Sequence, residues 1–368
     1  RYTPFTWLTF DANVSYDRSD RRLNYFLDQG KKTEGYALGG LGEISQFAGT
    51  TNTINAEASA NVLRKFGEIT LRSTARALLE SEKNELTTAR GQDFAVPAVR
   101  SLDNAKTRFV ESSVEQVKAS GYFITLGGDY AGKYIADGLV RRDGSSLFGA
   151  NERWNTYYRV SGAWRVAQES WWKWGSINEF KLRASQGTAG GRPGFNDQYE
   201  TYTFSTAGGV SKQNLGNKNL RPEHSTETEL GIDAIVKDRY SVQLSYAKVK
   251  TIDQLIQIPL AGFFGYGQQW QNAGTVEGNT IEGTLEAQLI KRPTLSWKAG
   301  LVADRSRNEI TKFDRSCFST QVIGYRCAGV GLSEMYGFQF LHDKKYLPAD
   351  AQLRENEFVM NDEGLLVW

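Results

Sequence analysis

The chain has 368 residues, of which 40% are hydrophobic, 12% aromatic and 23% charged, and its formal net charge is +2 at pH 7. Because the basic residues are interspersed with acidic ones and no Lys/Arg-rich stripe stands out, the composition argues against a dedicated nucleic-acid binder. No run of about 18 to 20 apolar residues occurs, which excludes a transmembrane helix but leaves a membrane β-barrel open.

An alternation of apolar and polar side chains, the period of a β-strand, recurs along the first 305 residues. Most runs end in a short charged turn, the first expected at DRSD (17–20), or in a longer polar loop, including one of about thirty residues after position 79. The pattern predicts twelve strands in six hairpins: 5–16 with 21–27, 54–62 with 69–79, 111–130 with 134–142, 152–166 with 178–187, 223–236 with 240–248, and 275–290 with 294–305.

The hairpin at 223–248 shows the pattern most clearly. In EHSTETELGIDAIV the even positions grow steadily more apolar towards Val236, while all four acidic residues are at odd positions. After the charged break at 237–239 the alternation resumes, with Tyr240, Val242 and Leu244 on one face and polar residues on the other. Two long strands with one apolar and one polar face, joined by a tight turn, are typical of an antiparallel hairpin.

The length of the predicted strands decides the fold class. Most reach or exceed the roughly nine to eleven residues of a tilted membrane-spanning strand, whereas soluble strands average about five to six. Short turns also alternate with long loops, as at the two ends of a transmembrane barrel. Because lipid offers no partner to an open sheet edge, the sheet must close. The sequence therefore predicts an all-β, antiparallel transmembrane barrel with short periplasmic turns and long extracellular loops.

The two faces of the predicted strands indicate which medium each one meets. The polar face carries too many charges for a narrow barrel filled by side chains, so we expect a wide lumen and roughly half of a plugged barrel of about 22 strands. The residues expected to face the lumen are Glu227, Glu229, Asp233, Glu282 and Glu286. Those expected to face lipid include Tyr240, Val242, Leu244, Leu285, Leu295 and Trp297.

Aromatic residues gather in two of the predicted long loops. Exposed rings stack on sugars or bury against a partner protein, but rings in long loops also pack among neighbouring loops, and the sequence leaves both interpretations open. The candidate contacts for a ligand or a lid are Phe263, Phe264, Tyr266, Trp270, Tyr199 and Tyr202. A separate group at 171–174 adjoins a short turn and is expected to join a periplasmic aromatic girdle.

Patterns of catalysis and metal binding are sparse. The chain has two histidines and holds no HExxH, GxSxG or Walker-type spacing. Its acidic residues follow the period of two, which lumen lining explains, so we expect neither an enzyme nor a cofactor or metal site. Cys317 and Cys327 lie close together in an irregular, glycine-bearing segment, where a loop disulfide is favoured over two unrelated thiols.

Three segments resemble a known family. The run RRDGSSLFG at 141–149, followed by NERWNTYYRVSGAWR at 151–165, resembles a signature of SusC/RagA-type TonB-dependent outer-membrane transporters. So does LGNKNLRPE at 215–223 running into STETELGID, and so does QNAG at 271–274 leading into IEGTLEA. Three motifs in the expected order are more specific than any one alone.

The resemblance implies active import of a large nutrient, a glycan or a peptide, across the outer membrane of a Gram-negative bacterium. In that family a plug fills the barrel, a SusD-like surface lipoprotein closes over it, and TonB supplies the energy. We therefore expect residues 1–305 to be a barrel segment of about twelve strands and 306–368 to be an extracellular loop region with further barrel material. The chain is expected to be an incomplete piece, with the plug that contacts TonB outside it.

Two other functions stay open on the residues alone. One is an outer-membrane barrel enzyme, such as a protease or lipase, in which loop acids, serine and histidine would act together. The other is a barrel that only anchors a surface-interaction protein. The identity of the nutrient does not follow from the sequence.

Overall fold

Strands make up most of the protein. The computed structural model describes residues 1–30, 40–149, 152–204, 208–320, 324–335, 337 and 340–367. The chain divides into two compact units, Arg1–Arg307 and Asn308–Trp368, which are described separately. Within the described ranges, no helix is both long and apolar enough to cross a membrane.

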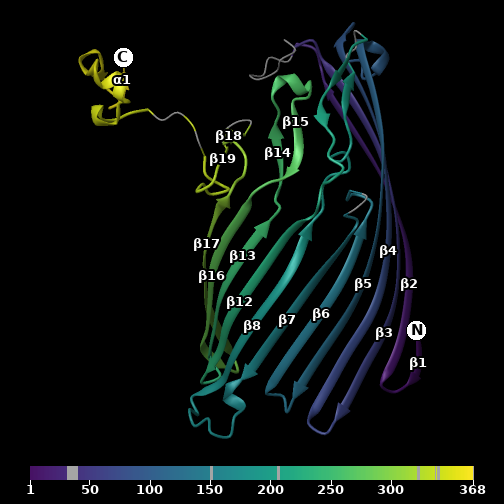
Figure 1. Ribbon diagram of the computed structural model, residues 1–368, viewed down its shortest axis with the longest axis vertical. Helices are drawn as coiled ribbons and strands as arrows, with labels where there is room; N and C mark the ends of the chain where they lie inside the picture. The colour runs from purple at the N-terminus through teal and green to yellow at the C-terminus, as the bar shows by residue number, and fades with distance from the viewer. Residues whose placement is uncertain are drawn as a thin grey trace. The chain divides into compact units, whose positions relative to one another are not determined.

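The first unit is built on one antiparallel sheet of twelve strands (Figure 1). Strands adjacent in the sheet follow one another in the chain, except where short loop strands intervene, and the sheet runs from β1 at one edge to β17 at the other. The strands are β1 (Tyr2–Phe5), β2 (Leu8–Leu27), β3 (Glu43–Phe66), β4 (Ile69–Phe94), β5 (Ala105–Tyr130), β6 (Tyr134–Ser145), β7 (Trp154–Arg165), β8 (Ile177–Gly191), β12 (Glu223–Val236), β13 (Tyr240–Ile252), β16 (Thr275–Arg292) and β17 (Leu295–Lys312). The predicted all-β class and long antiparallel strands are confirmed.

Tight turns join the strands at the lower end of the sheet in Figure 1. Two of them hold positive φ at both central positions, Ala131 and Gly132 in one and Lys237 and Asp238 in the other. Positive φ at both positions defines a type I′ turn, whose twist matches that of the strands it joins. The charged breaks in the alternation at these two places are therefore hairpin turns.

The start of the chain differs from the prediction. The turn expected at 17–20 is wrong, because β2 runs through it without interruption and the first turn lies at 6–7. The Arg18 guanidinium lies 2.9 Å from the Asp20 carboxylate, and the Thr50 hydroxyl donates to that carboxylate at 2.7 Å. This run of charges is thus solvent-exposed strand whose side chains satisfy one another.

The loop of about thirty residues expected after position 79 is also wrong. β4 continues to its end at Phe94, so only residues 95–104 connect it to β5, and they include the short 3-10 helix η1 (Leu102–Asn104). Each of these strands has 26 residues. At about 3.3 Å per residue such a strand is about 85 Å long, far more than the hydrocarbon core requires. The alternation lapses after position 79 because most residues on both faces of the strand are polar beyond it, as expected of a strand that continues into water.

A small apolar cluster stabilises the far ends of these long strands. It consists of Ile44, Phe94 and Ala105, with Phe26 and Leu102 packed against them. Gly42 has a φ of 87°, and a Cβ at this position would overlap the Phe94 ring. Glycine is therefore required both by the backbone conformation and by the close approach of the ring.

The apolar face of the sheet is open along its length. Leu244 is 49% exposed, Leu285 is 45% exposed and Trp297 is 56% exposed. In the register, Val242 of β13 lies between Ala234 of β12 and Leu285 of β16, so the apolar rows of neighbouring strands coincide. Because no second layer in the described ranges covers these rows, they are available to lipid.

Two segments singled out in the sequence, 141–149 and 215–223, each lie at the end of a strand. In the run at 141–149 the chain bends only from Ser146, because β6 continues to Ser145 and Gly144 packs beneath the Trp154 ring. A Cβ at Gly144 would lie 3.0 Å from ring atoms of Trp154, so this glycine serves ring packing and not the bend. Pro222 immediately precedes β12, as a residue without an N–H donor should at a strand entry.

The long connections of the first unit contain short elements of their own. Helix η2 lies between β7 and β8, and the remaining elements lie on either side of β12 and β13. Their bounds are η2 (Val166–Gln168), β9 (Tyr202–Phe204), β10 (Val210–Lys212), β11 (Asn214–Leu215), β14 (Leu255–Pro259), η3 (Gly262–Phe264) and β15 (Gln268–Asn272).

The second unit is small and has little regular structure. Cys317 and Cys327 are joined by a disulfide. Leu347, Ala351 and Leu366 form its buried apolar cluster. Its elements beyond the end of β17 are β18 (Phe318–Ser319), β19 (Tyr325–Arg326), η4 (Lys344–Tyr346), α1 (Ala349–Gln352), η5 (Glu355–Glu357), β20 (Val359–Met360) and β21 (Leu366–Val367).

Candidate functional site

The polar face of the sheet can be followed from strand to strand by its register. Asp233 of β12 lies opposite Lys181 of β8 on one side and Gln243 of β13 on the other. Gln243 in turn lies opposite Thr284 of β16. Directly opposed residues point to the same side of a sheet, so these four belong to one face, which we call the polar face.

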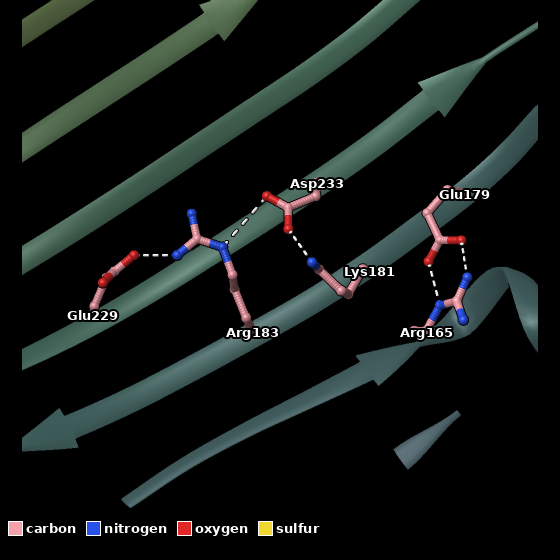
Figure 2. A network of polar contacts seen from close by, with 6 residues as sticks. All are labelled: Arg165, Glu179, Lys181, Arg183, Glu229 and Asp233. Atoms are coloured by element: carbon pink, nitrogen blue, oxygen red, sulfur yellow. Dashed lines mark hydrogen bonds and ion pairs between the residues drawn. The ribbon is translucent and has the colours of Figure 1, made fainter. Parts of the chain in front are cut away.

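A network of charges lies on the polar face across β7, β8 and β12 (Figure 2). We call it the charged ladder, and it comprises Arg165, Glu179, Lys181, Arg183, Glu229 and Asp233. The Arg183 guanidinium binds Glu229 and also lies 3.4 Å from Asp233. The other oxygen of Asp233 lies 2.7 Å from the Lys181 ammonium. Asp233 therefore binds two cations, and Arg183 binds two anions.

The remaining pair of the ladder is bidentate. Two nitrogens of Arg165 donate to the two carboxylate oxygens of Glu179, at 2.8 and 2.7 Å. Side chains throughout the ladder are only partly exposed, with Asp233 at 19% and Arg183 at 32%. Because charges of opposite sign neighbour each other, the polar face carries many ions without a large net field.

Gly231 makes room for Arg183. The two residues lie directly opposite each other in the register, and a Cβ on Gly231 would overlap the guanidinium. The missing side chain leaves the space in which the guanidinium lies between Glu229 and Asp233, two residues away on either side. The same relation recurs elsewhere on the sheet, where glycines lie opposite the aspartates of β6.

The five acidic residues predicted to line the lumen all fall on the polar face. Glu229 and Asp233 belong to the charged ladder, and Glu227 lies on the same side of β12. Glu282 and Glu286 lie opposite serines of β13 that share the face. The structure thus brings the five to one side of the sheet, while their contact with a lumen stays a prediction.

The basic half of the ladder was not among the predicted site residues. Arg165, Lys181 and Arg183 occupy alternate positions in segments that the sequence assigned to strands. That alternation was the available signal, but it does not show which acidic residue each cation faces. Only the registers of β7 with β8 and of β8 with β12 supply that information.

A second cluster on the polar face is organised by an aromatic ring. The guanidinium carbons of Arg76 and Arg141 lie 5.5 and 5.8 Å from the centroid of the Phe123 ring. Arg141 also donates to Asp143 at 2.7 Å. Cation–π contacts and an ion pair hold these arginines in place and keep their charge on the polar face.

The two long connections on either side of β12 and β13 are joined to each other. β11 pairs in parallel with β15, and the Asn217 side chain donates to the Trp270 carbonyl at 2.9 Å. The backbone N–H of Arg221 donates to Asn272 at 2.9 Å. Segments about fifty residues apart in the chain therefore form one loop platform at the upper end of the sheet in Figure 1.

One carboxylate links the two connections within this platform. The hydroxyls of Tyr202 and Tyr266 both donate to the same oxygen of Glu200, at 2.8 and 2.7 Å. The Lys212 ammonium lies 4.7 Å from the centroid of the Tyr266 ring. We call these four residues the loop cluster.

The hydrogen bonds of the loop cluster fix its charge. Those from Tyr266 and Tyr202 hold the pKa of Glu200 below its usual range. Hydrogen bonding with Tyr202 and with Glu200 raises the pKa of the Tyr266 phenol. At neutral pH the cluster therefore presents an ionised Glu200 carboxylate that accepts a hydrogen bond from the neutral Tyr266 phenol.

The six aromatic residues predicted to contact a ligand or a lid take two kinds of position. Tyr266 is buried and Trp270 is half-buried, so these two build the platform. Phe263 is 84% exposed, and its ring centroid lies 4.3 Å from that of Phe264. The remaining two, Tyr199 and Tyr202, are also exposed. Contact of any of them with a ligand or a lid stays a prediction.

The chemistry that this arrangement offers is binding. Exposed rings can stack on sugar rings or bury against protein, and the loop-cluster carboxylate accepts hydrogen bonds. Within the described ranges, no group of three or more His, Cys, Asp and Glu side chains could hold a metal ion. The His224 ring stacks on Tyr157 with centroids 6.1 Å apart, which is a packing role.

Comparison with known proteins places the whole sheet in a family. Residues 1–325 match the family described as TonB dependent receptor-like, beta-barrel. The TonB-dependent receptor P39 of Formosa agariphila is 25% identical over 364 residues, an alignment that covers 94% of this chain and 34% of the relative. The TonB-dependent receptor SusC of Bacteroides thetaiotaomicron is 28% identical over 207 residues, which cover 52% of this chain and 20% of SusC.

Solved structures share the fold. The RagAB peptide transporter matches with a TM-score of 0.77 and 21% identity over 93% of this chain and 39% of that one. The ferric citrate transporter FecA in its unliganded form matches with a TM-score of 0.54 and 10% identity over 84% of this chain and 42% of that one. The chain thus spans about a third of the curated relative that it matches over most of its own length.

Proposed function

The chain belongs to the TonB-dependent receptor-like β-barrel family, and from this premise we propose that it forms part of the wall of a transporter for large nutrients. Such a barrel lies in the outer membrane of a Gram-negative bacterium. We propose that the complete protein imports a glycan or a peptide by TonB-dependent active transport, with a SusD-like lipoprotein as its lid. We propose further that it has no enzymatic activity.

The observation that carries this proposal is the contrast between the two faces of the sheet. The apolar face exposes Leu244, Leu285 and Trp297, which suits contact with lipid. The polar face holds the charged ladder, whose partly exposed ions suit water or a polar plug and not hydrocarbon. A wall with these two faces fits a wide barrel filled by a separate plug domain.

The loop platform supports the proposed partner and substrate class. Phe263 is 84% exposed and Phe204 is 81% exposed, more than a loop that packs only on itself would leave. Rings so placed can bury against a lipoprotein lid or stack on a sugar or peptide. We propose that residues 1–305 are barrel wall and that 306–368 add extracellular loop and further barrel material.

Deleting the gene for the complete protein tests the transport proposal. The mutant should lose growth on one polysaccharide or on a protein digest as sole carbon source, and should grow normally on glucose and free amino acids. Deleting tonB should reproduce the defect, and a plasmid copy of the gene should reverse it. Normal growth on every polymer, or hydrolysis of the polymer by the purified protein, would contradict the proposal.

The lid contact has a separate test. The complete protein is purified by an affinity tag, and the lipoprotein that accompanies it is measured by mass spectrometry. Replacing Phe263 and Phe264 by serine should release the lipoprotein, because the exposed apolar rings are lost. The matched control is Leu353→Ser, which removes an 89% exposed apolar side chain from the second unit. Equal recovery from both variants would refute the lid contact and leave the transport proposal standing.

A further inference from the structure

A groove runs along the apolar face over β2 to β5. Its floor is made of small side chains, among them Ala58, Ala60, Ala75 and Ala77, and its volume is about 810 Å³. Large side chains flank the floor, with Phe10 on the β2 side and Tyr122, Ile124 and Val140 on the other. The hollow arises because a stripe of alanines lies between two rows of bulky residues.

A second hollow of about 620 Å³ follows along the same strands. Its lining starts with Ala56 and Leu79, the next outward-facing residues of β3 and β4 after the alanines. It ends at Lys118 and Arg153 beside Trp154. Along the apolar face, the two hollows thus adjoin basic residues. We call Lys118, Arg142 and Arg153 the basic margin.

Two basic residues at this margin point to the apolar face. Arg142 lines the first hollow and lies opposite Tyr122 in the register, and its guanidinium carbon lies 5.7 Å from the centroid of the Trp154 ring, which lines the second hollow. Lys118 shares this face because it lies opposite Ser81, two residues beyond Leu79. Both are exposed. Within the described ranges, neither forms an ion pair.

Several lysines of this face are paired with carboxylates. Lys83 pairs with Glu85 at 2.6 Å, and Lys250 pairs with Glu277 at 3.0 Å. Lys118 and Arg142 differ from these lysines in adjoining the hollows without a carboxylate partner in the described ranges. Cations left unmatched beside hydrocarbon call for an anion from the membrane itself.

The backbone around the basic margin is tied down. The Lys118 N–H donates to the Ser146 hydroxyl at 3.0 Å, and the Ser146 N–H donates to the Lys118 carbonyl at 2.9 Å. The Ser145 N–H donates to the Arg153 carbonyl at 3.2 Å. The strands that carry the cations are thus held together where the second hollow ends.

We propose that the two hollows and the basic margin form a binding site for a phosphorylated, multi-acyl glycolipid of the outer leaflet. The acyl chains fill the alanine-floored groove, and the phosphorylated headgroup lies against Lys118 and Arg142. The long loops mark the extracellular end of the sheet, and the basic margin lies towards that end, which places it at the headgroup level of the outer leaflet. Arginine and lysine bind phosphate through charge-assisted hydrogen bonds.

Native mass spectrometry of the complete protein in mild detergent tests this site, with monophosphoryl lipid A as the probe. The variant K118Q/R142Q should bind at least about tenfold less lipid, as expected for two cations lost at a headgroup surface. The control K248Q/K250Q removes the same charge from the same face, where Glu277 engages both lysines, and should bind like the parent protein. Folding of each variant is verified by its heat-dependent migration in gel electrophoresis.

The acyl part of the site has its own variant. A58L/A77L fills the groove with apolar side chains that lipid tolerates, and it should also weaken binding of the probe. Dephosphorylated lipid A and phosphatidylethanolamine should bind weakly to the parent protein. Equal binding by the parent and K118Q/R142Q, an equal loss in K248Q/K250Q, or equal binding of the dephosphorylated probe would each overturn the proposal.

Discussion

Replacing Gly231 by alanine perturbs the geometry of the charged ladder without removing a charge. The new Cβ would overlap the Arg183 guanidinium, which must then leave its position between Glu229 and Asp233. We expect the free energy of unfolding of the complete protein to fall. The whole decrease should come from displacement of the Arg183 guanidinium. A variant of this kind separates the arrangement of the charges from their presence.

The magnitude follows from the contacts that are lost. Each partly exposed ion pair of Arg183 contributes up to about 1 kcal/mol, and forcing a side chain from a packed position costs about 1 to 3 kcal/mol. Alanine is better than glycine in a strand by about 0.5 to 1 kcal/mol. The net destabilisation should therefore be about 1 to 3 kcal/mol. Because Arg183 is about a third exposed, the lower part of that range is favoured.

The assay is denaturant unfolding in detergent, followed by tryptophan fluorescence. Gly128→Ala is the matched control, since a Cβ at that strand position meets nothing within 4 Å. The double variant G231A/R183A should be no less stable than R183A alone, because the overlap disappears with the guanidinium. Equal stability of G231A and G128A, or full additivity in the double variant, would refute the role assigned to Gly231.

Three further predictions follow from the loop cluster, the disulfide and the two faces. The pKa of Glu200 is held low in the folded protein, so the ionised carboxylate stabilises the loops above the ordinary glutamate pKa, and this stabilisation is lost as pH falls through the lowered pKa. Hydrogen exchange of the loop platform should therefore become faster in acid. Glu200→Gln should abolish that pH dependence. Reducing the disulfide between Cys317 and Cys327 should cost about 3 kcal/mol locally, which limited proteolysis should detect in the second unit and not in the sheet. Leu244→Arg on the apolar face should destabilise the folded barrel by about 2 to 4 kcal/mol, whereas Gln243→Arg on the polar face should cost less than about 1 kcal/mol; equal effects on unfolding would contradict the assignment of the faces.

The alternation of side chains was sufficient to predict the sheet and its two faces. It failed where both faces of a strand are polar, because the charged run at 17–20 then looks like a turn and residues 80–94 look like a loop. Strands that continue into water need no apolar side, so their pattern carries no period. In β4 this missing signal hid fifteen residues of strand, 80–94.

The sequence predicts which types of residue belong to the candidate site, but it does not predict which of them contact each other. Exposed aromatics and lumen-facing acids follow from residue type and period, but Glu200 has no distinguishing neighbour in the sequence. It matters because a separate loop brings Tyr266 to the carboxylate that Tyr202 also contacts. Contacts of this kind depend on register and loop pairing, which period alone does not determine.

The most direct test of the account measures which medium each face of β16 meets. A spin label is placed at Leu285 or at Glu286 in the complete protein, with Cys317 and Cys327 replaced by serine, and the protein is reconstituted in lipid vesicles. Oxygen, which concentrates in hydrocarbon, should relax the label at 285 more strongly, and a water-soluble nickel chelate should relax the label at 286 more strongly. Reversed accessibilities, or two labels equally open to the chelate, would contradict the account.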